Sequence, residues 1–237
     1  MALSAPASTR LTPRRGFDLS ARLFAGPLGL VAFLAVSAVL ARRRAGDDAS
    51  TLPMSALARG DLGWVQRLDF VLLAGCVAVF GAAAGRAMGG RTGRAVLAVL
   101  AGVAVALVGL ATFRMDAVTV SEAGRLEIVR RTLVGDVHMA VSGVLAVLVA
   151  AYCGLSARYF SRVARTRAGL SVLCGLGVVG LSTAFVVTQS TGGPGGLLEG
   201  LALLFVVPQS AMVAEWFAFP SRRAGKPPPW TSPIASS

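Results

Sequence analysis

Six runs of apolar residues divide this chain, and each is long enough to form a membrane-spanning helix. They cover residues 23–41, 68–85, 95–113, 139–157, 168–188 and 197–219. A helix needs about 20 residues to cross the ~30 Å of bilayer hydrocarbon. Backbone amides cannot stay unpaired in lipid, and the runs are far too long for barrel strands. The pattern therefore predicts an all-α fold, a polytopic transmembrane bundle of six helices.

Composition supports this class. Of the 237 residues, 55% are hydrophobic and only 14% are charged, which is too apolar for a soluble domain of this size. The net charge of +12 could suggest nucleic-acid binding. However, the basic residues are dispersed at the ends of the apolar runs and have no interleaved aromatic residues, as the positive-inside rule predicts. We therefore expect membrane lipids as partners and no nucleic acid. The sequence identifies no protein partner.

The charges also predict an orientation. Fourteen of the 23 basic residues lie in the two termini and in the loops 86–94 and 158–167, whereas nine of the 11 acidic residues lie on the opposite side. Both termini are therefore expected in the cytoplasm of a bacterial cell, with the protein in the inner membrane. Only the basic cluster 42–44 argues the other way. The first run resembles a signal peptide, but its long core and this cluster favour a retained helix.

The expected organisation has three parts. Residues 1–22 form a basic cytoplasmic tail, residues 23–219 form the six-helix transmembrane domain, and residues 220–237 form a disordered cytoplasmic tail rich in proline. Two long loops, 42–67 and 114–137, lie on the outer side. Thr119 and Glu122 have capping-box spacing in the second of them, which predicts a short interfacial helix reaching Arg131.

Candidate chemistry gathers at the outer ends of the helices, where polar residues near the membrane are expected to serve a function. The candidate residues for this outer polar pocket are Asp116, His138, Glu199, Asp136, Asp69 and Ser55. His138 is the only histidine in the chain, and an imidazole beside carboxylates can act as a general base, proton relay or metal ligand. The simpler interpretation, which we favour for His138, is a hydrogen bond that ties helix ends together. Carboxylates at helix N-termini likewise often serve as caps.

No cofactor or catalytic motif is evident. A catalytic zinc usually has three protein ligands, and the chain has no His-x-x-x-His pair, so we predict no metal site. A site built from His138 and carboxylates is a weaker alternative. Serine-hydrolase elbows, phosphate-binding glycine loops and dinucleotide fingerprints are absent from the sequence.

The order of these residues resembles a known family. Ser55 and Leu57 lie in the first outer loop, Phe70 lies near the start of the second helix, and Phe113 and Asp116 follow the third. His138 begins the fourth helix and Gly-Leu-Leu-Glu at 196–199 begins the sixth. The arrangement is similar to the domain-of-unknown-function 998 family, six-span membrane proteins of bacteria and archaea, over residues 23 to 219.

The chain differs from the family pattern at three positions. Ala56, Arg114 and Gly200 stand where the family has glutamate, proline and arginine. The resemblance implies a six-span fold and no particular activity. Three functions remain open: a membrane protein that binds a lipid or small solute in the outer polar pocket, which we favour, a transporter or proton-coupled carrier, and an intramembrane lipid-headgroup hydrolase.

Overall fold

Six long helices account for most of the chain in the computed structural model, which describes residues 13–45, 50–120, 126–191 and 193–219. The helices are α1 (Pro13–Ala45), α2 (Gly63–Met88), α3 (Gly90–Thr112), α4 (Leu133–Phe160), α5 (Arg165–Thr191) and α6 (Gly195–Ala218). A short 3₁₀ helix, η2 (Met54–Ala58), lies between α1 and α2. A two-stranded hairpin, β1 (Val118–Val120) and β2 (Leu126–Ile128), lies between α3 and α4. The six-helix prediction is confirmed.

All six helices are long and apolar enough to cross a membrane. Each contains all or nearly all of the apolar run that predicted it and extends beyond it by two or more residues at one end or both. The helices α3 and α6 end one residue before their runs do. Flanking polar residues continue a helix because its backbone hydrogen bonds are local. The proposed basic tail illustrates this: its residues 13–22 belong to α1, and residues 1–12 and 220–237 lie outside the described part of the chain.

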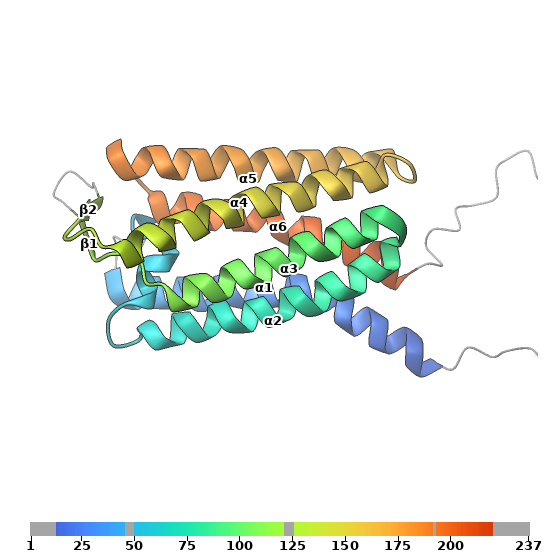
Figure 1. Ribbon diagram of the computed structural model, residues 1–237, viewed down its shortest axis with the longest axis horizontal. Coiled ribbons are helices and arrows are strands. Elements are labelled where there is room, and N and C mark those ends of the chain that lie inside the picture. Colours follow the sequence, from blue (N-terminus) through green and yellow to red (C-terminus); the bar gives the residue numbers. More distant parts are fainter. Residues whose placement is uncertain (1–12, 46–49, 121–125, 192, 220–237) are drawn as a thin grey trace, which may run out of the picture.

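The helices form a closed ring. Each helix packs against the next one in sequence, and α6 returns to pack against α1. Figure 1 shows α4 and α5 on one side of the bundle and α1, α2 and α3 on the other, with α6 behind. Pro27 interrupts the hydrogen bonding of α1, whose N-terminal part diverges from the bundle. A ring of this kind encloses a central space, and its size depends on the side chains that point inward.

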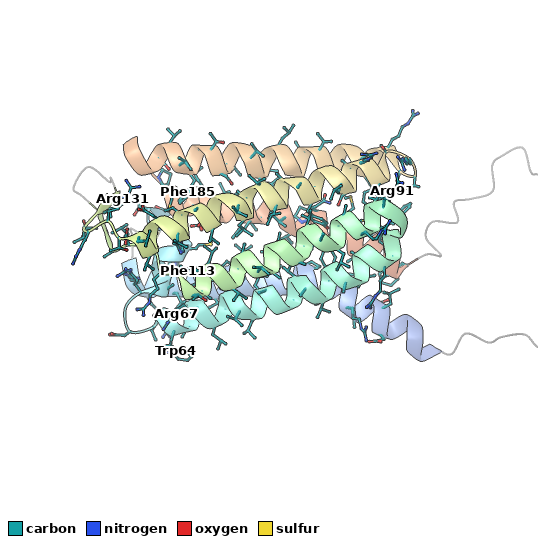
Figure 2. The ribbon with its side chains drawn as sticks, in the orientation of Figure 1. Trp64, Arg67, Arg91, Phe113, Arg131 and Phe185 are labelled. Atoms are coloured by element: carbon teal, nitrogen blue, oxygen red, sulfur yellow. The ribbon has the colours of Figure 1, made fainter. Side chains whose placement is uncertain are left out.

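The two ends of the bundle differ. One end, called the loop end below, carries η2, the hairpin, the start of α2, α4 and α6, and the end of α1, α3 and α5. Trp64, Arg67, Phe113 and Arg131 lie there, and Arg91 lies at the opposite end (Figure 2). The start of α1 and the end of α6 both lie at that opposite end, which is called the terminal end below. All the candidate site residues therefore belong to the loop end.

The hairpin replaces an expected helix. Residues 118–120 pair with 126–128 in antiparallel register, with Val118 opposite Ile128, and the Val129 N–H donates to the Ala117 carbonyl over 2.9 Å. The interfacial helix predicted here is therefore wrong. The β-branched residues Val118, Thr119 and Val120 favour extended backbone, whereas the capping-box spacing needs a helical pattern behind it. Glu122 lies outside the described residues.

Close contact between α2 and α3 depends on glycine. A Cβ atom on Gly81 would lie 2.8 Å from the Leu100 side chain, and one on Gly85 would lie 2.8 Å from the Gly93 carbonyl oxygen. Gly89, between the two helices, has a φ of +65°, which suits glycine. Gly81 and Gly85, four residues apart on α2, thus allow the two helices to approach closely within the bundle.

Two buried polar residues are paired near the loop end of the bundle. Ser37 on α1 and Gln66 on α2 are fully buried, and the Gln66 side-chain amide donates to the Ser37 hydroxyl over 3.0 Å. Inside a bilayer a buried amide without a partner is costly, so this bond fixes the register of the two helices. Neither residue was among the candidates predicted from the sequence.

Candidate functional site

The short helix η2 covers the loop end and is held by two arginines. Its residues Ser55, Ala56, Leu57 and Ala58 are all buried. Arg44, at the end of α1, donates to the carbonyls of Ala56 (2.5 Å) and Arg59 (3.1 Å). Arg59 in turn donates through Nε to the Met115 carbonyl over 2.5 Å. These charge-assisted bonds connect α1, η2 and the segment after α3, so Arg44 has a structural role here.

Asp116 connects the segment after α3 to the start of α4. Its carboxylate is buried, with 5% of the residue exposed, and accepts two bonds from Thr132: one from the hydroxyl (2.5 Å) and one from the backbone N–H (3.0 Å). The Thr132 hydroxyl also accepts from the Gly135 N–H over 3.2 Å and so caps α4. The Asp116 carboxylate thus helps to position the N-terminus of α4 through Thr132.

The hydrogen bond from the Thr132 hydroxyl lowers the pKa of the Asp116 carboxyl below its ordinary value, and the bond from the Thr132 N–H adds to this effect. The positive charges of Arg59 and Arg131 lower this pKa as well. A carboxyl whose pKa is lowered by folding adds stability above the unfolded value of about 3.9. That stability is lost as pH falls through the folded value.

We expect the melting temperature of the purified protein to fall as the pH is lowered below about 4, in part because Asp116 becomes protonated. Thr132→Val removes the hydroxyl donor and should make this fall smaller, whereas Thr132→Ser keeps the donor and should behave like the wild type. Thermal unfolding followed by circular dichroism between pH 3 and 7 measures the effect. Equal pH dependence in both variants would contradict this role.

Asp136 and Ser55 also bond locally. The Asp136 carboxylate pairs with Arg131 at 2.8 Å, where both side chains are exposed, so the pair contributes little to stability. The pairing raises the pKa of Arg131 further. The Ser55 hydroxyl lies 3.4 Å from the Met115 sulfur. Neither residue lines the central cavity described below.

His138 ties helix ends together. Its ring is buried, with 1% exposed, and Nδ1 lies 2.6 Å from the Phe113 carbonyl oxygen, which requires a proton on Nδ1. Among the described residues no carboxylate oxygen lies within 4.0 Å of either ring nitrogen. Nε2 is buried and has no hydrogen-bond partner among these residues. The contact that general acid–base catalysis by a histidine–carboxylate pair would need is therefore not made here.

Asp69 lies on α2 near Gln66 and is 7% exposed. Its Oδ2 atom is buried and has no hydrogen-bond partner among the described residues. No group of three or more histidine, cysteine, aspartate or glutamate side chains positioned to hold a metal occurs in the described part of the chain. The loop-end carboxylates are thus spread over separate contacts.

Glu199 differs from the other candidates. It lies in the second turn of α6, and its Oε2 accepts a bond from the Met54 N–H over 2.7 Å, which ties α6 to η2. Its side chain also lines a cavity at the centre of the bundle. Among the described residues that line this cavity, Glu199 alone is ionisable.

The central cavity has a volume of about 210 Å³ and receives side chains from every helix. One lining residue from each helix, in order, is Phe33, Phe70, Leu107, Leu145, Val178 and Leu203. Apart from Glu199, the polar side chains on its wall are the hydroxyls of Ser142 and Ser182. An apolar cavity with few polar groups is typical of a site for an apolar ligand.

A second cavity of about 70 Å³ continues the first toward the terminal end. The two share six lining residues, which are Leu73, Leu107, Leu145, Val149, Leu203 and Val206. The second cavity reaches Tyr152 on α4 and Ser210 on α6. Together they form an elongated space that runs along the bundle axis from Glu199.

The six candidate residues therefore share one end of the bundle without forming one pocket. Asp116, Asp136, His138 and Ser55 make contacts among loops and helix ends, and only Glu199 lines the central cavity. The residues that sequence analysis missed are the apolar cavity walls. No sequence signal separates an inward leucine that lines a cavity from one that fills it.

Comparison with known proteins agrees with this architecture. No curated protein and no solved structure matches the chain. The model of one family, described as protein of unknown function (DUF998), matches residues 27–215, from within α1 to the last turn of α6. The match includes α2 to α5 completely, most of α1 and α6, and every candidate site residue. The chain therefore belongs to the DUF998 family.

Proposed function

We propose that this multi-pass membrane protein binds the apolar chain of a lipid or similar small amphiphile in its central cavity. The observation that carries the proposal is the cavity itself, which is lined by apolar side chains from all six helices. Burying a side chain at this centre would stabilise the bundle through packing. A bundle that instead keeps a space along its axis forgoes that packing, which favours a binding role.

The cavity wall supports entry from the bilayer. Met139 on α4 and Val186 on α5 line the cavity, yet they are 39% and 61% exposed on the bundle surface. Residues that are both lining and exposed mark an opening, here between α4 and α5 near the loop end. An apolar chain can enter laterally through it without leaving the hydrocarbon region.

Two other functions are less well supported. A carrier for a polar solute or proton needs polar groups along its path. Below Glu199, however, the described residues of the cavity wall offer only serine hydroxyls and the hydroxyl of Tyr152. A lipid-headgroup hydrolase would need an activated base, and His138 bonds to the Phe113 carbonyl rather than to a carboxylate. We favour binding for these reasons.

The proposed orientation places the loop end outside and both termini in the cytoplasm of a bacterial inner membrane. The distribution of arginine supports it, because Arg86, Arg91, Arg94, Arg158 and Arg162 lie at the terminal end. The cavity and Glu199 would then face the outer leaflet.

Filling the cavity should abolish binding. Ala202 is buried and lines the cavity, so Ala202→Phe places a ring inside it. We expect photolabelling by a twelve-carbon alcohol that carries a diazirine, with the protein in lipid nanodiscs, to fall about tenfold or more, a loss of roughly 1.4 kcal/mol in binding free energy. Mass spectrometry should map the wild-type label to the cavity walls on α4 and α6.

The matched control is Ala151→Phe, the same change at an exposed position of α4 that does not line the cavity. It should leave labelling unchanged. Ala146→Phe, which fills the cavity from α4, tests the result from a second helix. Uniform labelling of the lipid-facing surface, insensitive to both cavity variants, would rule out the proposal.

A further inference from the structure

We infer that the cavity selects a single-chain amphiphile whose polar end is a hydrogen-bond donor, a hydroxyl or an amine, and that Glu199 recognises this end group. The inference rests on the proposed function and adds the chemical class of the ligand. Three observations carry it: the position of the carboxylate, the lack of any basic group on the cavity wall, and the length of the cavity.

The Glu199 carboxylate is held in place and still has bonding capacity. Oε2 accepts the Met54 N–H, and η2, to which Met54 belongs, is fixed by Arg44. A Cβ atom on Gly200 would lie 3.0 Å from the Met54 methyl group, so α6 and η2 are already in close contact. Oε1 receives no hydrogen bond from the described residues. An ionised carboxylate can only accept, and it has several sites for donors.

The cavity wall provides no competing cation. No arginine, lysine or histidine lines either part of the cavity, so the described wall contains no group that would neutralise an anionic ligand. A ligand carboxylate or phosphate at this end would meet the Glu199 charge in an apolar surrounding, where repulsion between like charges is strong. A hydroxyl or ammonium group would instead donate to the free oxygen, and an ammonium would also compensate its charge.

The cavity length sets the length of the chain. Glu199 and Ser210 lie eleven residues apart on α6, which corresponds to about 16 Å along the helix axis. At about 1.3 Å of length per bonded carbon, this space accommodates a single extended chain of roughly 12 carbons. The far end is bounded by the buried Tyr152 ring and by Phe80, whose ring meets it edge-on at 6.2 Å between centroids. A chain much longer than this would meet these two rings.

The test compares three ligands that share a twelve-carbon chain and differ only in the end group: dodecylamine, dodecanol and dodecanoate. Each competes with the diazirine-bearing alcohol for the protein in nanodiscs at pH 7.5. With the wild type we expect the amine and the alcohol to compete at least about tenfold more strongly than the carboxylate. With Glu199→Gln the advantage of the amine over the carboxylate should fall to about threefold or less, because the amide has no charge.

Two control variants define the effect. Glu199→Asp keeps the charge and should keep the preference for the amine. Glu215→Gln makes the same change on the same helix at a residue that pairs with Arg167 and does not line the cavity, and it should behave like the wild type.

The outcomes separate the inference from the proposed function. Equal competition by the three ligands, with labelling still lost in Ala202→Phe, would overturn the end-group selection and leave chain binding intact. Stronger competition by the carboxylate would also overturn it. Labelling that is insensitive to Ala202→Phe would remove the proposed function itself.

Discussion

Replacing Gly135 by alanine should destabilise the protein, although the same change inside a helix normally stabilises. Alanine in place of a helical glycine usually adds about 0.5–1 kcal/mol. At Gly135, however, the new Cβ atom would overlap all three heavy atoms of the Asp116 carboxyl group. The carboxyl group would have to move away from Thr132, and the connection between the end of α3 and the start of α4 would be lost. We expect the melting temperature to drop by several degrees.

Gly154→Ala is the matched control, because it lies on the same helix and a Cβ atom there would meet nothing within 4 Å. It should leave the melting temperature unchanged or raise it. Thermal unfolding of both variants in the same detergent gives the comparison. The prediction fails if the two substitutions shift the melting temperature in the same direction.

The α2–α3 contact should be the most sensitive packing site in the bundle. A Cβ atom on Gly93 would overlap the Gly85 carbonyl oxygen and lie 3.4 Å from the carbonyl carbon of Met88. Backbone cannot yield as a flexible side chain can, so Gly93→Ala must push the two helices apart. Overpacking of this kind costs about 1–3 kcal/mol, and we expect the upper part of that range.

Gly75→Ala tests the same change on the exposed side of α2, where a Cβ atom has open space. Its effect on unfolding should be small. Denaturant or thermal unfolding in matched micelles measures both variants, and cross-linking between cysteines introduced on α2 and α3 would report any separation. A loss in Gly93→Ala no larger than in Gly75→Ala would show that the contact is not tight.

The six spans could be predicted from hydropathy alone because lipid imposes a simple length requirement on apolar helices. What hydropathy does not contain is the pairing of polar groups. Asp116 was selected as a pocket residue, yet Thr132, its partner, lies sixteen residues away in a loop that contains no helical pattern. The strands at residues 118–120 and 126–128 were missed because the interpretation followed the capping-box spacing and did not consider the β-branched residues beside it.

Glu199 and His138 both show that a single sequence does not determine what surrounds a side chain. Both stood out in the sequence because ionisable groups are rare near membrane depth. For His138, the favoured interpretation was a hydrogen bond between helix ends, and its contact with the Phe113 carbonyl agrees with it. Glu199, in contrast, lines a cavity that no local sequence pattern predicts. Whether a side chain lines a cavity or packs against other side chains depends on the arrangement of all six helices, which local patterns in a single sequence do not reveal.

The contact between α6 and α1 has a consequence for biosynthesis. Because the ring closes only where its last member meets its first, a ribosome must finish Gly195–Ala218 before α1 gains its second neighbour. Until then the Met54 N–H lacks Glu199, and the inward faces of the first five helices border lipid or the translocon. A nascent chain halted before residue 195 would therefore leave exposed the faces of α1 and α5 that α6 normally covers. Membrane quality-control proteases could recognise these faces and degrade the chain.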